Sequence, residues 1–366
     1  MRMKTIVHGL GLAVLAGLTC KPAPKTDLLK PHPVFSIRRG TNISHWLSQS
    51  DRRGEARRAW FTEEDVEFLA GLGFDHLRIP VDEEQLWDEK GNMEKEAFNL
   101  LDAGLDWCAR ARLRAIVDLH ILRSHHFNEA VKPLWTDPKA QERFVQCWRD
   151  LSSRLKDRPK EAVAYELMNE AVADDPNQWN DLFARALSVI RVLEPERVIV
   201  VGSNRWQSPD TFDDLRVPAV DTNILLSFHF YTPLVFTHYR ASWTPVGKYT
   251  GPVHYPGRII EDGNLQGQPE ELLREIAPHN GDFDRVKLDS LIQEPIRVAR
   301  RTGLPLYCGE WGCLPTVPEK DRLQWYADMR TNLEKYGIAW ATWDYKGSFG
   351  IRGPEGKPVI DALLNP

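Results

Sequence analysis

Short apolar runs alternate with longer amphipathic segments along most of the chain. This alternation is typical of strand–helix units arranged around a parallel sheet. The apolar runs predict eight strands, at residues 36–42, 76–80, 114–120, 163–169, 197–202, 224–230, 304–310 and 338–344. The amphipathic segments predict helices at residues 62–71, 94–112, 138–156, 177–193, 284–301 and 319–336. We therefore predict an α/β fold, a single (β/α)8 TIM barrel whose active site lies at the carboxyl ends of the strands.

The connection after the sixth predicted strand is longer than the others. It runs from Tyr231 to about Asp282, is rich in Pro, Gly and Tyr, contains Trp243 and lacks a clear hydrophobic period. Loop insertions of this length in a compact domain are usually functional. Two interpretations stay open at this point: a solvated excursion with some helix of its own, or a wall of a substrate cleft.

Composition places the chain among ordinary soluble globular proteins. Of its 366 residues, 42% are hydrophobic and 27% are charged, and 13 are Trp. The 47 Lys and Arg residues against 52 Asp and Glu residues give a formal net charge of −5. Because no basic excess is present to neutralise phosphate groups, we expect no nucleic-acid partner. Cys108, Cys147, Cys308 and Cys313 show no metal-ligand spacing, and we expect free buried thiols.

The first 20 residues resemble an export signal. Arg2 and Lys4 precede an apolar run over residues 6–18, which is too short to span a bilayer of about 30 Å. Cys20 precedes a Pro-containing stretch, as at bacterial lipoprotein cleavage sites, although Thr19 is a poor match to the small residue usual before that cysteine. Lipidation at Cys20, secretion without a lipid, and a buried or disordered leader all stay open.

This leader divides the chain into three parts. We place the export signal at residues 1–20, a linker at 21–32 and the barrel domain at 33–366. The expected location is outside the cytoplasm: secreted, periplasmic or lipid-anchored at the bacterial cell envelope. Contact with a membrane is expected only through a lipid anchor.

Two glutamates end predicted strands that face each other across the barrel. Alternate residues of a barrel strand point inward, so Glu170 shares a face with Glu166 and Met168, and Glu310 shares a face with Cys308. Glu166 lies deeper, where a salt bridge is expected. Glu170 and Glu310 can converge on one bond from opposite sides of the mouth. Glycoside cleavage needs such a pair, one carboxyl to protonate the leaving oxygen and one to attack or to activate water.

Polar and aromatic side chains end the other predicted strands in the same way. A single inward His or Trp is more often a packed core residue than a functional one. A ring of such residues at one end of a barrel is hard to explain by packing. The ring consists of Arg78, His120, His229, Tyr231 and Trp343.

These residues, in this order and at these strand ends, resemble glycoside hydrolase family 5, the cellulase-like group of clan A. The resemblance covers residues 33–366, from the Arg-Gly-Thr-Asn segment at 39–42 to the segment at 343–351. It implies that Glu170, in the Asn-Glu pair of the fourth strand, is the acid/base and that Glu310 is the nucleophile. It also implies that Asn169 bonds the sugar 2-hydroxyl and that Trp343 forms the floor of the −1 subsite.

Two positions depart from the family pattern. Trp311 follows Glu310 where Phe is frequent, and Ala171 stands where Pro often follows Asn-Glu. Neither position touches the proton-transfer chemistry. Both leave the subfamily and its sugar open.

The companion residues have physical roles of their own. Glu310 must be anionic to attack a sugar carbon, and Arg78 and Tyr231 supply a charge and a donor that favour its ionisation. Glu170 must hold a proton, which the negative charge of Glu310 promotes at the roughly 5–5.5 Å separation of retaining enzymes. Once a glycosyl-enzyme forms, that charge disappears and Glu170 becomes available as a base.

Further aromatic residues lie in or near the predicted loops at the strand ends, where an indole can stack on a pyranose. Trp206, just after the fifth strand, is the strongest candidate for substrate binding. The others are equally well explained as loop-packing residues: Trp46, Trp60, Trp87, Trp135 and Trp311. The pair His125-His126 lacks a third ligand at suitable spacing, so we expect no metal site there and no cofactor.

The leading interpretation is a retaining O-glycosyl hydrolase that acts on a β-linked polysaccharide or oligosaccharide, as an endo-β-1,4-glucanase (cellulase). A β-mannanase, an exo-acting β-glucosidase and a β-1,3-glucanase would share every catalytic residue. A metal-dependent barrel hydrolase would need a His-x-His pair on an early strand, which His45 and His120 do not provide. A carbohydrate-binding barrel without activity would have lost one carboxylate, and both are present.

Overall fold

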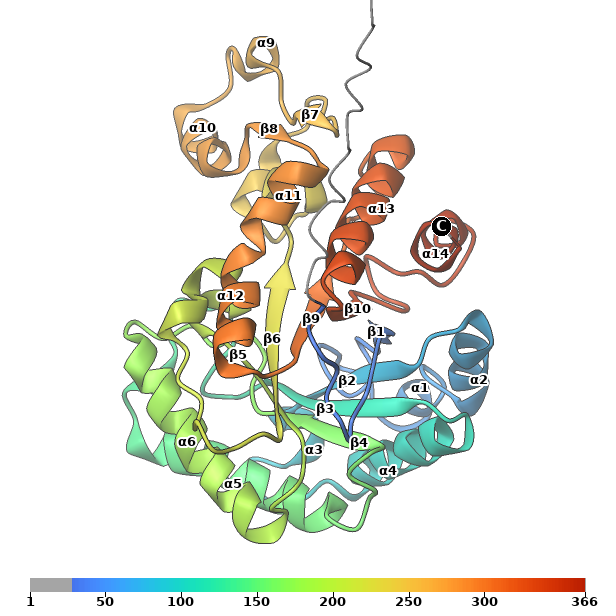
Figure 1. Ribbon diagram of the computed structural model, residues 1–366, viewed down its shortest axis with the longest axis vertical. Coiled ribbons are helices and arrows are strands. Elements are labelled where there is room, and N and C mark those ends of the chain that lie inside the picture. Colours follow the sequence, from blue (N-terminus) through green and yellow to red (C-terminus); the bar gives the residue numbers. More distant parts are fainter. Residues whose placement is uncertain (1–27, 366) are drawn as a thin grey trace, which may run out of the picture.

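The computed structural model describes residues 28–365, and the predicted export signal with Cys20 lies outside them. Eight parallel strands close into a barrel in the order β1-β10-β9-β6-β5-β4-β3-β2 (Figure 1). The strands are β1 (Arg39–Asn42), β2 (His76–Asp82), β3 (Arg114–Ile121), β4 (Val163–Glu166), β5 (Ile199–Gly202), β6 (Ile224–Phe230), β9 (Leu306–Trp311) and β10 (Ala339–Thr342). Each overlaps a predicted strand, so the predicted (β/α)8 barrel is confirmed.

Helices cover the outside of the barrel. The longer ones are α2 (Glu63–Leu72), α4 (Lys95–Arg110), α5 (Pro138–Leu155), α6 (Pro176–Leu193), α12 (Gln293–Thr302) and α13 (Glu319–Lys335). Shorter helices are α1 (Gly54–Arg58), α3 (Glu83–Leu86), α7 (Asn204–Gln207), α11 (Arg285–Leu291) and α14 (Lys357–Leu364), with the short 3₁₀ helices η1 (Pro133–Trp135) and η2 (Pro209–Asp214). Within residues 28–365, no helix combines the length and apolar character needed to cross a membrane.

The helix predicted over residues 284–301 is two helices, α11 and α12, separated at Ile292. Pro295 lies in the first turn of α12 and has no N–H to donate to the carbonyl of Leu291. A continuous helix would need that hydrogen bond and would place the proline ring against the same carbonyl. The break therefore follows from Pro295.

The barrel interior changes from apolar to polar along the strands. Near the amino ends, Phe35 and Ile37 pack with inward residues such as Ala164 and Val200. Near the carboxyl ends the buried inward residues are polar: Arg78, Asp118, Glu166, His229 and Glu310. The apolar end forms a packed core, and the polar end faces the loops that carry the candidate site.

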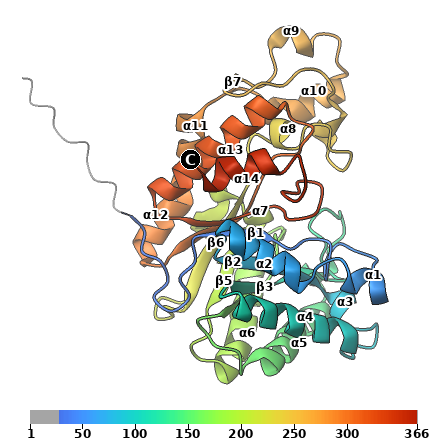
Figure 2. The same cartoon turned by 90° about the vertical axis from the view of Figure 1, so that its right-hand side faces the viewer.

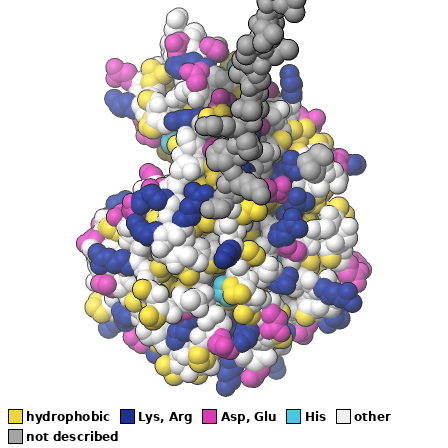
Figure 3. Space-filling view, in the orientation of Figure 1, with side chains coloured by type: hydrophobic (Ala, Val, Ile, Leu, Met, Phe, Trp, Pro, Cys, Tyr) yellow, Lys and Arg dark blue, Asp and Glu magenta, His cyan; other side chains and the backbone are white. Residues whose placement is uncertain are grey.

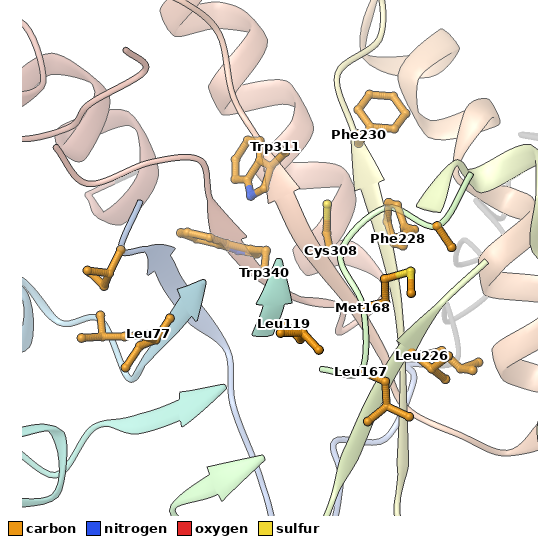
Figure 4. Close-up of a cluster of buried hydrophobic side chains, with 14 of the residues drawn as sticks. Leu77, Leu119, Leu167, Met168, Leu226, Phe228, Phe230, Cys308, Trp311 and Trp340 are labelled. Atoms are coloured by element: carbon orange, nitrogen blue, oxygen red, sulfur yellow. The ribbon is translucent and has the colours of Figure 1, made fainter. Parts of the chain in front are cut away.

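The alternation of inward and outward residues fails at the end of β4. This strand ends at Glu166, and residues 167–170 follow an irregular path. As a result, the side chains of Glu166 and Asn169, three residues apart, both bond Arg78. Met168 instead packs in the hydrophobic layer between strands and helices (Figure 4). The prediction that Met168 and Glu170 share a strand face is therefore wrong, although Glu170 still reaches the barrel mouth.

A second failure of the alternation lies in β9. Phe228 of β6 pairs with Cys308, but the next residue, His229, pairs with Glu310, so Gly309 is an extra residue in the ladder. A bulge of this kind turns the following side chain to the other face. The bulge turns Glu310 inward, whereas Cys308, which precedes the bulge, points outward into the hydrophobic layer (Figure 4), so the predicted inward position of Cys308 is wrong. The four cysteines from Cys108 onward are free and buried, as predicted.

The connection between β6 and β9 carries secondary structure of its own. Its elements are α8 (Leu234–Thr237), η3 (Pro245–Lys248), β7 (Gly257–Arg258), α9 (Asp262–Leu265), α10 (Glu270–Ile276), η4 (Ala277–His279) and β8 (Asp282–Phe283). The strands β7 and β8 form an antiparallel pair. Figures 1 and 2 show β7, α9 and α10 at one end of the molecule, with α5 and α6 at the other. The hydroxyl of Tyr255 donates to Asp328 of α13 at 2.8 Å, which ties this segment to the barrel.

Basic and acidic side chains are intermixed on the face shown in Figure 3. The structure also contains ion pairs between neighbouring elements, such as Arg191 with Asp221 at 2.7 Å. The fields of exposed charges are largely screened by salt beyond a Debye length. Positive and negative side chains therefore lie among one another on this face, in a chain whose formal net charge is −5.

Candidate active site

A cleft of about 1270 Å³ opens at the carboxyl ends of the barrel strands. Pockets that hold one small ligand have volumes of roughly 300–1,000 Å³, so this cleft has room for a larger substrate. Loops after β1, β3, β5 and β10 and the segment after β6 form its walls. Residues from these walls include Gln49, His126, Phe127, Trp206, Trp243 and Phe349.

Glu170 and Glu310 both line this cleft and are almost fully buried, with 8% and 4% of their surface exposed. A carboxylate oxygen of Glu170 lies within 4.8 Å of one of Glu310. Carboxyl groups about 5–5.5 Å apart are typical of retaining glycosidases, whereas inverting enzymes separate them by roughly 6.5–9.5 Å. The spacing favours direct attack by one carboxylate over activation of an intervening water.

Arg78 connects the polar side chains beneath the cleft. Its Nη1 donates to Glu310 at 2.6 Å, its Nε donates to Glu166 at 2.6 Å, and its Nη2 donates to the Oδ1 atom of Asn169 at 2.9 Å. Burial alone would lower the pKa of Arg78, but the carboxylates of Asp118, Glu166 and Glu310 hold it well above its usual value. Arg78 therefore stays charged, and the predicted salt bridge of Glu166 is confirmed.

Tyr231 and His229 contact the two glutamates from the sixth strand and the residue after it. The hydroxyl of Tyr231 donates to Oε2 of Glu310 at 3.0 Å. Nδ1 of His229 lies 2.9 Å from Oε1 of Glu170 and 3.7 Å from Oε2 of Glu310. Burial and the nearby charge of Arg78 lower the pKa of His229 well below its usual value, so its ring is neutral. It provides hydrogen bonding between the carboxyls without adding a charge.

The two carboxyl groups differ in their attraction for a proton. Burial, followed by the negative charge of Glu310, raises the pKa of Glu170 well above its usual range. Burial also raises the pKa of Glu310, but Arg78 and the Tyr231 hydroxyl act in the opposite direction. Glu170 is therefore the group that holds the proton, and Glu310 is the group that carries the negative charge.

His120 and Trp343 form a flat surface beside the pair. Their rings stack with a centroid distance of 5.4 Å and an interplanar angle of 7°. Nδ1 of His120 lies 2.7 Å from Oδ2 of the buried Asp118. Burial lowers the pKa of His120 to about 3, so this ring is uncharged at neutral pH. A stacked pair of planar rings suits the apolar face of a sugar.

Asn169 lies directly before Glu170 and is fully buried. Its Oδ1 atom is bonded to Arg78, whereas its Nδ2 atom has no hydrogen-bond partner among residues 28–365. A buried donor without a partner is costly unless a ligand supplies an acceptor. This amide is consequently a candidate donor to substrate.

One cluster within residues 28–365 has the geometry to hold a metal ion: Glu170, His229 and Glu310, whose ligand atoms lie within 4.8 Å of one another. Arg78 already supplies a positive charge 2.6 Å from Glu310. His125 and His126, the pair considered in the sequence, do not join this cluster. The Nε2 atom of His125 accepts from the backbone N–H of Val172 at 3.2 Å, and His126 lines the cleft.

Of the tryptophans considered near the strand ends, Trp206 lines the cleft and is 44% exposed. Others are buried in the hydrophobic layer: Trp46, Trp87, Trp135 and Trp311. Trp60 is partly buried and lies under the guanidinium of Arg52. Trp243, from the segment after β6, also lines the cleft and is 51% exposed.

Sequence reasoning missed three buried members of the network. Asp118 bonds both His120 and Arg78, Asn42 accepts from Arg78 at 2.8 Å, and Gln207 accepts from the backbone N–H of Glu170 at 2.9 Å. The strand alternation could have found Asp118, which is two residues before His120. Gln207 gave no comparable signal because it lies in an irregular turn.

The sequence of this chain is similar to those of known proteins. The family profile of cellulase (glycosyl hydrolase family 5) matches residues 40–348. The chain belongs to glycosyl hydrolase family 5. Endoglucanase C of Acetivibrio thermocellus is 32% identical to this family 5 enzyme over 91% of the chain and 98% of the relative. Cellodextrinase A of Ruminococcus flavefaciens is 28% identical, over 83% of this chain and 84% of the relative.

The same fold occurs in solved structures. The crystal structure of endoglucanase Cel5A from the hyperthermophilic Thermotoga maritima superposes on this family 5 enzyme with a TM-score of 0.72 and 23% identity. The match covers 89% of this chain and 97% of the Thermotoga chain. At that level of identity the likeness concerns the barrel fold.

The different proton affinities of the two glutamates lead to a first prediction. Replacing Glu310 by Gln removes its negative charge and is expected to lower the pKa of Glu170, because an ionised Glu170 is then no longer repelled. Carboxyl-carbon NMR titration of 13C-Glu-labelled Glu310→Gln and wild-type enzyme measures this pKa, with Glu170→Gln to assign the signal. An unchanged or higher pKa would show that Glu310 does not control the protonation of Glu170.

Proposed function

We propose that this family 5 enzyme is a retaining endo-β-1,4-glucanase with Glu170 as acid/base and Glu310 as nucleophile. The observation that carries the proposal is the close approach of a protonated and a charged carboxyl group, within 4.8 Å, at the floor of a large cleft. Their different electrostatic surroundings supply the two roles that double displacement requires.

In the first step, a Glu310 oxygen attacks the anomeric carbon of the sugar while Glu170 donates its proton to the leaving glycosidic oxygen. The bond between that oxygen and the anomeric carbon breaks, and an ester between Glu310 and the sugar forms. Before the attack, Arg78 and Tyr231 hold Glu310 in place through bonds of 2.6 and 3.0 Å. Asn169 would donate its free Nδ2 hydrogen to a hydroxyl next to the reacting carbon.

In the second step, water replaces the ester. The charge on Glu310 is now absent, so the repulsion that raised the pKa of Glu170 is lost and Glu170, now ionised, is the base that takes a proton from water. The hydroxide equivalent attacks the anomeric carbon, and the Glu310 carboxylate leaves. Two inversions at the same carbon return the β configuration.

The cleft suits a chain of several sugars. Trp206 and Trp243 expose indole surfaces within it, and the stacked ring of Trp343 lies at its floor. Flat aromatic surfaces of this kind match the apolar faces of β-linked pyranoses. The relatives named above are an endoglucanase and a cellodextrinase, which supports a β-1,4-glucan as the substrate.

A panel of polysaccharides tests the substrate. We expect reducing ends to appear from barley β-glucan and carboxymethyl-cellulose, with an early fall in viscosity, because an endo enzyme cuts within chains. Laminarin, mannan and xyloglucan serve as comparison substrates. Faster cleavage of mannan or laminarin, or release of single sugars without a loss of viscosity, would contradict the proposed substrate and mode.

Leaving-group dependence tests the roles of the glutamates. Glu170→Ala should lower kcat/KM for a natural glucan by about 10²–10⁴-fold, because general acid catalysis contributes that much. It should leave kcat/KM for a dinitrophenyl β-cellobioside nearly unchanged, since this leaving group needs no proton. Glu310→Ala should reduce hydrolysis of both substrates by several orders of magnitude.

Azide separates the two faces of the sugar in the same variants. With Glu170→Ala, azide attacks the glycosyl-enzyme and gives a β-glycosyl azide. With Glu310→Ala, azide attacks an activated β-substrate directly and gives the α product. NMR identifies the anomers, and the opposite pair of products would mean that the two roles are exchanged.

We also infer that the enzyme is exported, on the basis of the charged start, the apolar run over residues 6–18 and Cys20. Mass spectrometry of the mature protein from a bacterial host should find an N-terminus at or near Cys20. An acylated Cys20 that is lost in Cys20→Ser would identify a lipid anchor, and an unmodified end would identify secretion. A protein that retains Met1 would contradict export.

A further inference from the structure

The loop that carries Glu170 is bonded to the segment that follows the next strand. The backbone N–H of Trp206 donates to the carbonyl of Ala171 at 3.2 Å. The side chain of Asn204 accepts from the N–H of Ala173 at 2.8 Å and donates to its carbonyl at 2.9 Å. These bonds hold the backbone just after Glu170. They involve the segment Asn204–Gln207, which we call the β5 clamp.

Gln207 makes the bond that reaches Glu170 itself. Its Oε1 atom accepts from the N–H of Glu170 at 2.9 Å, and its Nε2 atom donates to Oε1 of Glu166 and to Oγ of Ser227, both at 3.2 Å. The side chain is 1% exposed. The oxygen of the Gln207 amide thus accepts one hydrogen bond and its NH2 group donates two. Only this orientation of the amide satisfies both its oxygen and its nitrogen.

The backbone at both ends of this hydrogen bond is in the left-handed region. Glu170 has a φ of +45°, and Arg205, Trp206 and Gln207 have φ values of +55°, +61° and +53°. Residues other than Gly adopt this region rarely, and a run of three is unfavourable unless the surroundings hold it. The run turns Gln207 inward toward Glu170 while Trp206 points into the cleft.

Two glycines make room for this arrangement. A Cβ atom on Gly202, the last residue of β5, would lie 2.2 Å from Cγ of Gln207. A Cβ atom on Gly309, directly before Glu310, would lie 2.8 Å from Oγ of Ser227. The Gln207 side chain therefore occupies space that strand residues with side chains would fill. It lies between the strand end that carries Glu170 and the bulge that positions Glu310.

We propose that Gln207 is a positioning residue for Glu170, and that the β5 clamp fixes the proton donor relative to the sugar platform of Trp206. This inference rests on the acid/base role proposed for Glu170. The carboxyl of Glu170 contacts His229, but its backbone lies beyond the end of β4 and outside the strand ladder. Without the hydrogen bond to Gln207, the N–H of Glu170 would lose its acceptor, and the backbone that carries the Glu170 carboxyl would no longer be held in place.

An amide, rather than an acid, fits this position. Gln207 presents an acceptor to the N–H of Glu170 and a donor to the carboxylate of Glu166. A carboxylate here would add a negative charge beside Glu166 and Glu170, whereas a hydrocarbon would leave the N–H of Glu170 and one oxygen of Glu166 with fewer partners. The two functions of the side chain can therefore be separated by substitution.

The test compares kcat/KM for cellotetraose, which needs a proton donor, with kcat/KM for dinitrophenyl β-cellobioside, which does not. Gln207→Met keeps the side-chain length and removes the hydrogen bonds. It should lower the ratio of the two values roughly 10- to 100-fold, because a displacement of about 1 Å in a catalytic group costs about that much. Azide should also raise kcat for the dinitrophenyl substrate in this variant, since azide needs no base.

Gln293→Met is the matched control. Gln293 lies in α12 outside the barrel, where its amide donates to Asp289 and Tyr336, and the same substitution there should leave the ratio unchanged. Gln207→Glu keeps the acceptor for the N–H of Glu170 but adds a negative charge beside Glu166, so it should recover only part of the ratio that Gln207→Met loses. Thermal unfolding of each variant shows whether it is folded. If Gln207→Met does not fold, Gln207→Ser, which leaves space for water, replaces it.

The outcomes separate the inference from the function it rests on. Equal losses on both substrates in Gln207→Met would overturn the positioning role and leave Gln207 a packing residue. If Glu170→Ala itself leaves the ratio unchanged, the acid/base assignment fails. A ratio that falls in Glu170→Ala but not in Gln207→Met overturns the inference alone.

Discussion

The active site depends on one buried cation. The Arg78 guanidinium is fully buried and lies within 3.0 Å of three carboxylates, those of Asp118, Glu166 and Glu310. A buried charge without partners costs several kcal/mol, so each member of this group needs the others. Arg78 bonds the nucleophile Glu310 directly and donates to the side-chain oxygen of Asn169. It also contacts Asp118, which in turn bonds and orients His120. Four strands thereby share one electrostatic anchor.

A closed barrel makes such an anchor feasible. The interior is packed with apolar side chains at the amino ends of the strands and becomes polar toward the carboxyl ends, where strands that are distant in the sequence converge. The apolar part supplies the stabilisation that offsets the burial of a charged network. The loops above the polar part do not have to offset the burial of charge. The cleft walls can therefore consist of varied aromatic and polar residues such as Trp206, Trp243 and His126.

Much of the fold and the catalytic pair could be predicted from the sequence, because strand–helix alternation and strand-end residues are local signals. Local signals failed where geometry departs from the regular period. The bulge at Gly309 puts Cys308 and Glu310 on different faces of β9, and the early end of β4 places Met168 in the hydrophobic layer. Trp46 and Trp311 look in sequence like Trp206, but they fill the space between strands and helices, and only their neighbours in three dimensions distinguish them. Gln207 could not be found because its function arises from a left-handed turn that no sequence period encodes.

The two glutamates are held in different ways, and the difference matches their chemistry. Glu310 belongs to a strand, and the ladder together with Arg78 places its carboxylate against a positive charge. Glu170 lies past the end of its strand, and its carboxyl contacts a neutral imidazole, that of His229, instead of a cation. A cation in contact with Glu170 would favour its ionised form and remove the proton that the first step requires. The proton donor must therefore be positioned by uncharged groups. The hydrogen bond from the backbone N–H of Glu170 to the side-chain amide of Gln207 does this, because it fixes Glu170 without adding a charge beside it.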